Sequence, residues 1–470
     1  MVLGKRTSKY RHALGTLGGK VAKYTNLRDV NTRIAVEGIG FGASAKWIAV
    51  SLTGTMGCIL ILDVAGSGKI PDGVLSGLEN GVQVCDVQWC PFDDDELAVA
   101  CADGNIRLWH VPEGGVESSI REPTKIIPAH NDKITLIRYH PTARDVMASA
   151  ASDGSIRISD LNEGNTVLDL NVNSQLTLSL CWSHSGNFLA AVTKDEMLSI
   201  FQPAKSPEPL KSCKAVDSVR GARACFVCDD EFILVSCFGK SSERTLKLFR
   251  SSDLTEVHSM TIDSNPQLLI PHYDYDSSVL FLTAKGERTI LLYEVIEESP
   301  WLLKLSDFTG PSPHQALCFQ PKHCCDFQRV QFGRAWRLGL NDLELLTFTV
   351  PRKKLECFQN DLFPATLTSW LPLLSAKDWF SGRQPPLQFA DFRPQGMPLL
   401  YPDDDMGSVT SSESDLRSTK PSPVSNGHAE RKPSHGTVMG AITSQYAMGK
   451  GRTSLEQDSM QGVHPNEWHD

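Results

Sequence analysis

Short runs in which apolar and polar residues alternate recur along most of the chain, and each run is closed by a polar turn. The two clearest copies are residues 97–109 (LAVACADGNIRLW) and residues 147–159 (MASAASDGSIRIS). Alternation with a period of two is typical of β-strands, and an Asp-Gly pair supplies the positive φ that a tight hairpin turn needs. The pattern therefore predicts a series of β-hairpins. Weaker copies follow the same pattern at residues 54–62, 194–201, 242–249 and 286–293.

The spacing of these hairpins distinguishes between the repeat folds. A repeat of about 40–50 residues with four short strands is typical of a β-propeller blade, whereas helical repeats show a 3.6-residue periodicity. Six copies are recognisable, and residues 315–352 are expected to supply a seventh, with strands at 326–340 and 344–350. A strand near residues 46–52 is expected to pair with a late strand, because a closed ring leaves no exposed sheet edge. We predict an all-β fold, a seven-bladed WD-repeat β-propeller.

Composition divides the chain into four predicted regions. A basic N-terminal arm covers residues 1–39, the propeller residues 40–352, and an extension residues 353–402, which is apolar enough to pack back onto the propeller. The tail, residues 403–470, is rich in Ser, Gly, Pro and His, so we expect it to be disordered. It has no sustained heptad pattern, and no coiled-coil oligomer is expected.

Several residues match the conserved hydrogen-bonding positions of WD repeats. His130 follows Pro-Ala where these repeats place Gly-His, Asp103 and Asp153 lie at the hairpin turns, and Trp109 ends a strand where an aromatic residue is usual. In this pattern a His, a strand Ser or Thr, a turn Asp and a Trp form a buried network that stabilises the blade. We therefore expect a structural role for Trp109, His130, Asp103 and Asp153.

The composition favours a soluble protein of a reducing compartment. Its 41% hydrophobic residues are distributed without a run long enough to span a membrane, and the first ten residues lack the apolar core of a secretory signal. The 13 cysteines follow no disulfide framework. We expect a cytoplasmic protein that does not insert into membranes.

No chemistry-bearing motif is complete. The cluster His323-Cys324-Cys325 has no CxxC pair and lacks zinc-ligand spacing, and the Gly-rich stretch at residues 38–42 is followed by no helix pattern. We expect no catalytic residues, no metal and no cofactor, and hence a protein that is not an enzyme. A net charge of -9 also argues against nucleic acid as a partner.

Outside the repeats, five landmarks in the right order resemble the coronin family. They are residues 8–12 (SKYRH), 268–286 (LLIPHYDYDSSVLFLTAKG), 298–300 (ESP), 349–352 (TVPR) and 358–364 (FQNDLFP). The resemblance implies an actin-filament-binding cytoskeletal regulator and adaptor that links filaments to the actin-related protein 2/3 complex. Other proteins are expected to bind the faces of the propeller.

The basic arm is the candidate actin-binding segment under this resemblance. Residues 1–33 hold eight Lys or Arg and one acidic residue, and actin filaments are acidic, so the arm supplies electrostatic steering. Arg28 stands near the position of an Arg that contributes to filament binding in the family. The predicted actin-binding residues are Lys9, Arg11, Lys20, Lys23 and Arg28.

The last residues resemble the acidic, Trp-containing tails of the tandem-propeller coronins, whose second propeller the chain also resembles. Glu467, Trp468 and Asp470 are expected to bind the actin-related protein 2/3 complex weakly, because His464 and Pro465 stand where further acids are expected. An alternative function is a propeller scaffold in Golgi-to-endosome vesicle traffic, with actin binding secondary. The expected location is the actin cytoskeleton, or Golgi and vesicles under this alternative.

Overall fold

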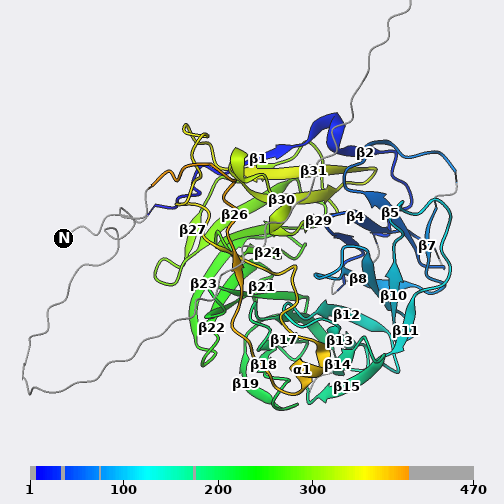
Figure 1. Ribbon diagram of the computed structural model, residues 1–470. Helices are drawn as coiled ribbons and strands as arrows, with labels where there is room; N and C mark the ends of the chain where they lie inside the picture. Colours follow the sequence, from blue (N-terminus) through cyan, green and yellow to red (C-terminus); the bar gives the residue numbers. More distant parts are fainter. Residues whose placement is uncertain (1–6, 33–37, 55, 74–75, 173–175, 402–470) are drawn as a thin grey trace, which may run out of the picture. The chain divides into compact units, whose positions relative to one another are not determined.

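The predicted propeller is confirmed by a computed structural model, which describes residues 7–32, 38–54, 56–73, 76–172 and 176–401. Seven sheets, antiparallel apart from one short parallel strand, follow one another around a common centre (Figure 1). The predicted disordered tail lies outside the described residues. None of the helices in the described ranges is long and apolar enough to cross a membrane.

Six blades are formed by consecutive strands, with the first strand of each blade innermost. The first blade contains β3 (Phe41–Ala43), β4 (Trp47–Ser51), β5 (Cys58–Asp63) and β7 (Gly77–Glu79), and the second contains β8 (Val84–Trp89), β9 (Glu96–Cys101), β10 (Asn105–His110) and β11 (Lys125–Pro128). The third contains β12 (Ile134–Tyr139), β13 (Val146–Ala151), β14 (Ile156–Asp160) and β15 (Asn165–Leu170), and the fourth contains β16 (Thr177–Trp182), β17 (Leu189–Thr193), β18 (Met197–Phe201) and β19 (Pro209–Lys214). The fifth contains β20 (Ala222–Val227), β21 (Phe232–Phe238), β22 (Arg244–Arg250) and β23 (Glu256–Asp263), and the sixth contains β24 (Ile270–Asp274), β25 (Val279–Thr283), β26 (Thr289–Val295) and β27 (Leu302–Lys304), with β28 (Phe308–Thr309) also paired with β26.

The seventh blade joins the two ends of the propeller. Its inner strands are β29 (Ala316–Phe319), β30 (Gln331–Leu338) and β31 (Asp342–Thr349). The outer edge of β31 pairs with β1 (Leu14–Leu17) and β2 (Lys23–Thr25), which are joined by the 3₁₀ turn η1 (Gly19–Ala22) (Figure 1). A two-residue strand, β6 (Gly68–Lys69), lies parallel to β2. The ring is thus closed by an early segment on a late blade.

Two details of the predicted seventh blade are wrong. Residues 46–52 do not close the ring, because β4 pairs with β3 and β5 inside the first blade. The strand expected at residues 326–340 begins only at Gln331. Before it come the short 3₁₀ turns η2 (Lys322–Cys324) and η3 (Phe327–Arg329), the second capped by the Asp326 side chain and ended by Val330 at a φ of 55°.

The hydrophobic core is divided among the spaces between neighbouring blades. Val192 of β17 and Leu198 of β18, for example, lie in one buried cluster with Phe226 of β20 and Ile233 of β21. A strand between two such spaces is covered on both faces, and β21 is buried at every position. This explains the continuous apolar sequence of such strands, because neither face meets water.

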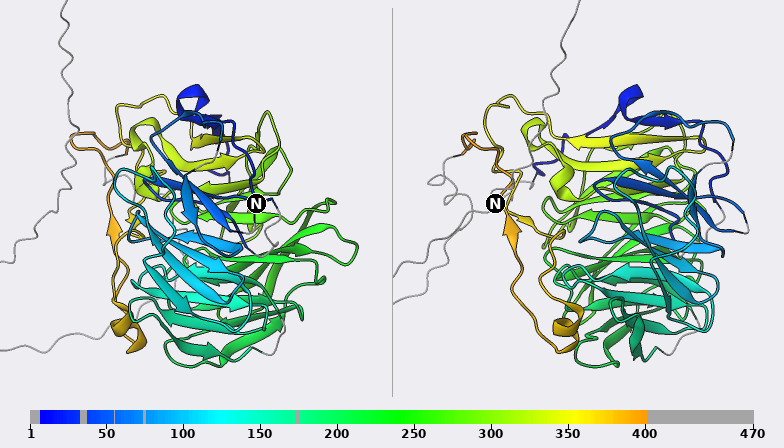
Figure 2. Two further views of the ribbon diagram at one scale, coloured as in Figure 1. Left: turned by 90° about the vertical axis from the view of Figure 1, so that its right-hand side faces the viewer. Right: turned by 45° about the vertical axis from the view of Figure 1, so that its right-hand side comes forward.

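The extension predicted to pack on the propeller lies along one face of it (Figure 2). It contains the two-stranded ribbon β32 (Thr366–Leu367) and β33 (Phe389–Ala390) and the one-turn helix α1 (Ala376–Phe380). Leu374 forms a β-bridge with Ala143, and Trp379 packs against His140, with ring centroids 5.1 Å apart. These contacts attach the extension to the third blade.

Candidate functional site

The basic N-terminal segment is anchored through one aromatic residue. Tyr10 is buried, and its hydroxyl donates a hydrogen bond to the backbone carbonyl oxygen of Leu362 at 2.6 Å. Its ring centroid lies 5.1 Å from that of Phe332 in β30. Burial raises the pKa of the Tyr10 hydroxyl well above its usual range, so it remains a donor. The neighbours Lys9 and Arg11 are exposed as a result.

The five predicted actin-binding cations do not form one cluster. They are spread along the outer edge of the seventh blade, because β1 and β2 pair with β31 along its length. At one end Lys9 contacts residue 361 of the extension, and at the other end the residue before Arg28 contacts the turn at residue 341. Lys9 donates to the backbone carbonyl oxygen of Asp361, while Arg11 and Lys20 are exposed and have no ion-pair partner among the described residues. Arg28, although exposed, forms an ion pair with Asp72.

Lys23 differs from the other four because it belongs to a row of charges across three strands. On β31, Glu344 lies opposite both Lys23 of β2 and Arg337 of β30. Lys23 pairs with Glu344 and with Asp342, the latter at 2.7 Å, and Arg337 Nη1 lies 3.2 Å from Glu344 Oε2. Arg337 is completely buried. The charge of Lys23 is therefore already compensated by carboxylates, and the main role of this residue is to hold β2 against β31.

Two of the residues predicted for a WD network, His130 and Asp153, lie in the third blade. The two ring nitrogens of His130 lie 2.8 Å from the hydroxyls of Ser149 and Ser155, and Ser155 donates to Asp153 at 2.6 Å. Burial lowers the pKa of His130 to about 4, so the ring is neutral at physiological pH. His130 and Asp153 are thus connected through Ser155, with Ser159 in the place of the usual Trp.

Trp109 and Asp103 lie in the second blade and take no part in that network. Trp109 Nε1 donates to Asn80 Oδ1 at 3.3 Å. Asn80 precedes the first strand of its blade, β8, at the same position that His130 has before β12. Asp103 accepts two hydrogen bonds from Arg107, at 3.0 and 2.7 Å, and these interactions lower its pKa to about 2 despite the opposing effect of burial. The four predicted residues therefore stabilise two separate blades.

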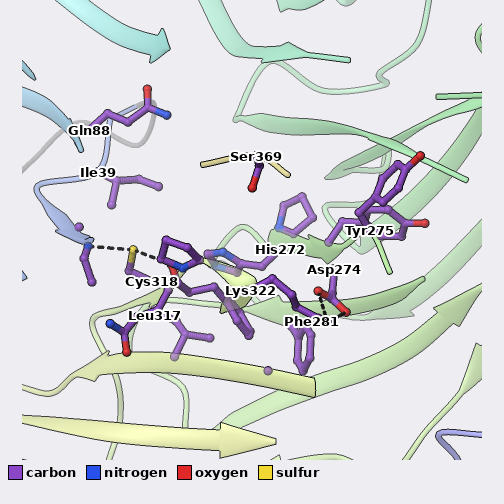
Figure 3. Close-up of a pocket in the computed structure, with 18 of the residues that line it drawn as sticks. Ile39, Gln88, His272, Asp274, Tyr275, Phe281, Leu317, Cys318, Lys322 and Ser369 are labelled. Carbon is purple, nitrogen blue, oxygen red and sulfur yellow. Dashed lines mark hydrogen bonds and ion pairs between the residues drawn. The ribbon is translucent and has the colours of Figure 1, made fainter. Parts of the chain in front are cut away.

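A central cavity of about 610 Å³ opens toward the extension, and no sequence motif indicated its charged lining (Figure 3). Lys322 Nζ lies 2.6 Å from Asp274 Oδ2 and 3.8 Å from Asp276 Oδ2. Thr366 of the extension donates to Asp276 at 2.8 Å, and burial raises the pKa of Asp276 to about 6. One ammonium group thus lies beside two carboxylates, and the hydrogen bond from Thr366 to Asp276 fastens the extension to the propeller.

The remaining predicted site residues, Glu467, Trp468 and Asp470, lie outside the described residues. Within the described ranges, no group of three or more His, Cys, Asp or Glu side chains is arranged to hold a metal ion. The ring of His323 packs against Trp370, with centroids 4.9 Å apart. The exposed edge of the seventh blade is consequently the main candidate for a binding surface.

Models of known families match three parts of the chain. A domain of unknown function (DUF1899) matches residues 4–69, a WD domain of the G-beta repeat type matches residues 71–110, and a type of WD40 repeat matches residues 343–386. The first match includes the whole described part of the basic segment.

Relatives are similar over nearly the entire chain. Coronin-7 of Mus musculus is 37% identical over 465 residues, which are 98% of this chain and 49% of that protein. Coronin-A of Dictyostelium discoideum is 29% identical over 80% of this chain and 83% of its own length. The chain therefore spans about half the length of the coronin-7 relatives that it matches.

A solved structure is similar in fold. The WD40 domain of Toxoplasma gondii coronin superimposes with a TM-score of 0.75 and 24% identity, covering 82% of this chain and 98% of that domain. At this level of identity the likeness concerns the fold alone.

Proposed function

The chain belongs to the coronin family of WD-repeat proteins, and from this membership we propose that it is an actin-filament-binding regulator and adaptor without enzymatic activity. One observation favours a filament contact at the seventh blade. The first landmark of the family, residues 8–12, is held at this blade by the buried Tyr10, and Lys9 and Arg11 remain exposed on the surface.

The electrostatics of this edge suit an acidic partner. Arg11 and Lys20 are exposed without ion pairs among the described residues, so a filament does not have to break an existing pair to reach them. Exposed charges act mainly by steering the encounter, and salt screens them over about 8 Å at physiological ionic strength. Arg28 contributes less in this proposal, because Asp72 already compensates its charge.

Reversing the two uncompensated charges tests the proposed surface. We expect the double variant Arg11→Glu with Lys20→Glu to weaken filament binding about tenfold at low salt, since each change alters the local charge by two units. Arg28→Asp should have a smaller effect. Co-sedimentation titrations with filaments measure the change, and Lys194→Glu, an exposed lysine at a turn of the fourth blade, is the matched control. Equal binding by the double variant and wild type would remove this edge as the contact.

We further propose that the tail links the propeller to the actin-related protein 2/3 complex. Trp468 follows Glu467 and is separated from Asp470 by His469, and an aromatic anchor with nearby carboxylates is a common way for a peptide to bind a basic groove. The interaction is weak in this proposal, because docking a flexible peptide costs chain entropy.

The peptide of residues 454–470 tests this link directly. In an anisotropy titration with the complex we expect measurable binding that Trp468→Ala reduces by about tenfold or more, as loss of a hot-spot aromatic does. Tyr446 lies outside the acidic end, so Tyr446→Ala in a longer peptide, residues 440–470, is the control. Binding that does not depend on Trp468 would show that the acidic end is not the anchor.

A further inference from the structure

The central cavity has the size of a small-molecule site. Its volume of about 610 Å³ lies within the roughly 300–1,000 Å³ of such sites. Aromatic side chains such as Phe41, Phe281 and Phe319 belong to its wall, and Leu367 and Ser369 of the extension also line it (Figure 3). A polypeptide therefore enters from this side only by displacing the extension, whereas a small molecule does not need to.

The cavity carries a positive charge that no carboxylate of its lining compensates. Its described lining contains four Lys or Arg, three Asp and no Glu. Arg138 pairs with Asp86 at 2.8 Å, and Lys322 lies beside the other two carboxylates. Arg334 of β30 lines the same cavity and forms no ion pair with any described residue. Its guanidinium group is therefore an open charge in the cavity.

The hydrogen bonds of Arg334 leave the end of its side chain unused. Arg334 Nε donates to Gln320 Oε1 at 2.8 Å, and Gln320 Nε2 donates to the backbone carbonyl oxygen of Ser44 at 2.9 Å. The two Nη groups have no hydrogen-bond partner in the described chain. A guanidinium group held through Nε presents its Nη groups as a pair, which matches two oxygens of a carboxylate or phosphate group.

This part of the cavity lies away from the gap that follows Thr32 in the described chain. Thr32 and Gly38, on the two sides of that gap, line a second, smaller cavity together with Leu338. Leu338 and Arg334 are on the same strand, β30, roughly 13 Å apart. The surroundings of Arg334 named above are thus at the other end of the strand, nearer the extension.

A second polar side chain of the cavity is oriented in a similar way. Gln88 of β8, which is drawn in Figure 3, accepts a hydrogen bond from the backbone N–H of Tyr139 through Oε1 at 2.8 Å. Its amide nitrogen donates to no described residue and is available as a donor. Arg334 and Gln88 are both fixed through one atom and unused at another, which is typical of preorganised ligand-binding groups.

We propose that the central cavity binds a small aromatic anion, with its carboxylate or phosphate group at the Nη atoms of Arg334 and its ring against the aromatic wall. The open guanidinium group selects the anion, and the phenylalanine side chains favour a ring. Gln88 supplies a further donor. This binding needs neither actin nor the actin-related protein 2/3 complex, so it goes beyond the proposed function.

One carboxylate near Arg334 opposes an anion. Burial raises the pKa of the Cys324 thiol to about 11, and the charges of Asp94 and Arg334 shift it in opposite directions, so both lie near this thiol. Asp94 accepts a hydrogen bond from the backbone N–H of Ala45 at 2.9 Å and forms no ion pair with Arg334. It therefore weakens anion binding by repulsion without occupying the guanidinium group.

Fluorine NMR with the full-length chain tests the proposal. The probes are fluorobenzoate, fluorophenyl phosphate and the neutral fluorobenzamide. We expect at least one anion to bind with a dissociation constant of about 1 mM or tighter, and the amide to bind at least about tenfold more weakly. The tighter anion assigns the bound group as carboxylate or phosphate. An amide that binds as tightly as the anions would overturn the proposal, as would a folded chain that binds neither anion at ten times that concentration.

Variants assign the binding to Arg334. Arg334→Gln should weaken anion binding about tenfold or more, whereas Arg334→Lys keeps the charge but loses the paired geometry and should have an intermediate effect. Asp94→Asn keeps an oxygen acceptor for Ala45 and should tighten binding about threefold. Arg121→Gln, at an exposed arginine that pairs with Glu79, is the matched control. Equal binding by Arg334→Gln and wild type would overturn the proposal.

Amide exchange of the wild-type chain locates the probe without any substitution. At a concentration of the tighter anion three times its dissociation constant, exchange in residues 367–370 of the extension should slow about fourfold, because these residues line the cavity. Exchange in residues 256–263, on the outermost strand of the fifth blade, should not change. Slowing that does not include residues 367–370 would place the probe elsewhere and contradict the site.

Discussion

Acidification from pH 7 to pH 5 should lower the free energy of unfolding by about 7 kcal/mol, because four histidines are held in the neutral form by burial. Burial lowers the pKa of His130 to about 4 and of His140 to about 3. Burial, with the nearby Arg337 guanidinium, lowers the pKa of His314 to about 4. Burial also lowers the pKa of His272 to about 4, so all four values lie below the ordinary value near 6.5. Each histidine thus supplies stability above pH 6.5 that is lost as the pH falls toward its folded-state pKa.

The contacts of His140 explain why its ring resists a proton. Nδ1 accepts a hydrogen bond from the backbone N–H of Ala143 at 2.8 Å, and Nε2 lies 2.8 Å from the carbonyl oxygen of Gly186, to which it must donate. A second proton would have to enter at Nδ1, against an N–H group. For His314, neither ring nitrogen has a partner in the described chain.

The size of the effect follows from the pKa differences. Between pH 6.5 and pH 5 each of the four histidines contributes about 2 kcal/mol, because one unit of pKa is worth about 1.4 kcal/mol. Asp276 acts in the opposite direction. Burial raises its pKa to about 6, so its protonation below pH 6 increases the free energy of unfolding by about 1 kcal/mol. The net loss is a large part of the 5–15 kcal/mol that is typical of a folded domain.

Denaturant unfolding followed at pH 7, 6 and 5 measures this dependence. His140→Gln should be less stable at pH 7 and should lose less stability on acidification, by about 2 kcal/mol. His110→Gln is the matched control, because that side chain is exposed. A free energy of unfolding that stays constant or rises as the pH falls to 5 would show that these four rings are not held in the neutral form.

Glu344→Ala should destabilise the fold by about 3–5 kcal/mol, because it leaves the buried Arg337 without a carboxylate. Arg337 retains the backbone and hydroxyl oxygens of Ser312 as acceptors, but these do not neutralise its charge. The change also removes one of the two ion-pair partners of Lys23 on β2. We therefore expect the seventh blade to open before the others, with faster amide exchange in residues 14–25.

Two variants separate this effect from a general loss of packing. Asp342→Ala removes the other partner of Lys23 at a site where both side chains are about one quarter exposed, and should cost less than about 1 kcal/mol. The double variant Arg337→Leu with Glu344→Leu removes both buried charges and should recover most of the lost stability. Urea midpoints give the three values. A double variant as unstable as Glu344→Ala would contradict the proposed cause.

The blades were predictable because their signal is local. A hairpin such as β9–β10 carries its alternation and its Asp103-Gly104 turn within a dozen residues, and the same holds for β13–β14. Ring closure lacks such a signal. The strands β1 and β2 are short, and their partner β31 is more than 300 residues away, so nothing in residues 14–25 alone indicates the pairing.

The candidate sites were predictable only in part, for a related reason. A basic segment is visible in the sequence, but whether a cation is available depends on acids from distant strands, as Lys23 and Glu344 show. The fastening of the extension was missed because Asp276, Lys322 and Thr366 come together only in the folded chain. The family resemblance was confirmed by the relatives, whereas the roles of individual basic residues and of the tail stay predictions.

Co-sedimentation of the full-length chain with actin filaments tests the central claim most directly. The proposed function predicts that the chain enters the pellet with filaments, that binding saturates, and that the bound fraction decreases as salt is raised, because exposed cations supply the contact. A chain that remains in the supernatant at low salt, with the propeller folded, would contradict the claim and favour the alternative of a vesicle-traffic scaffold.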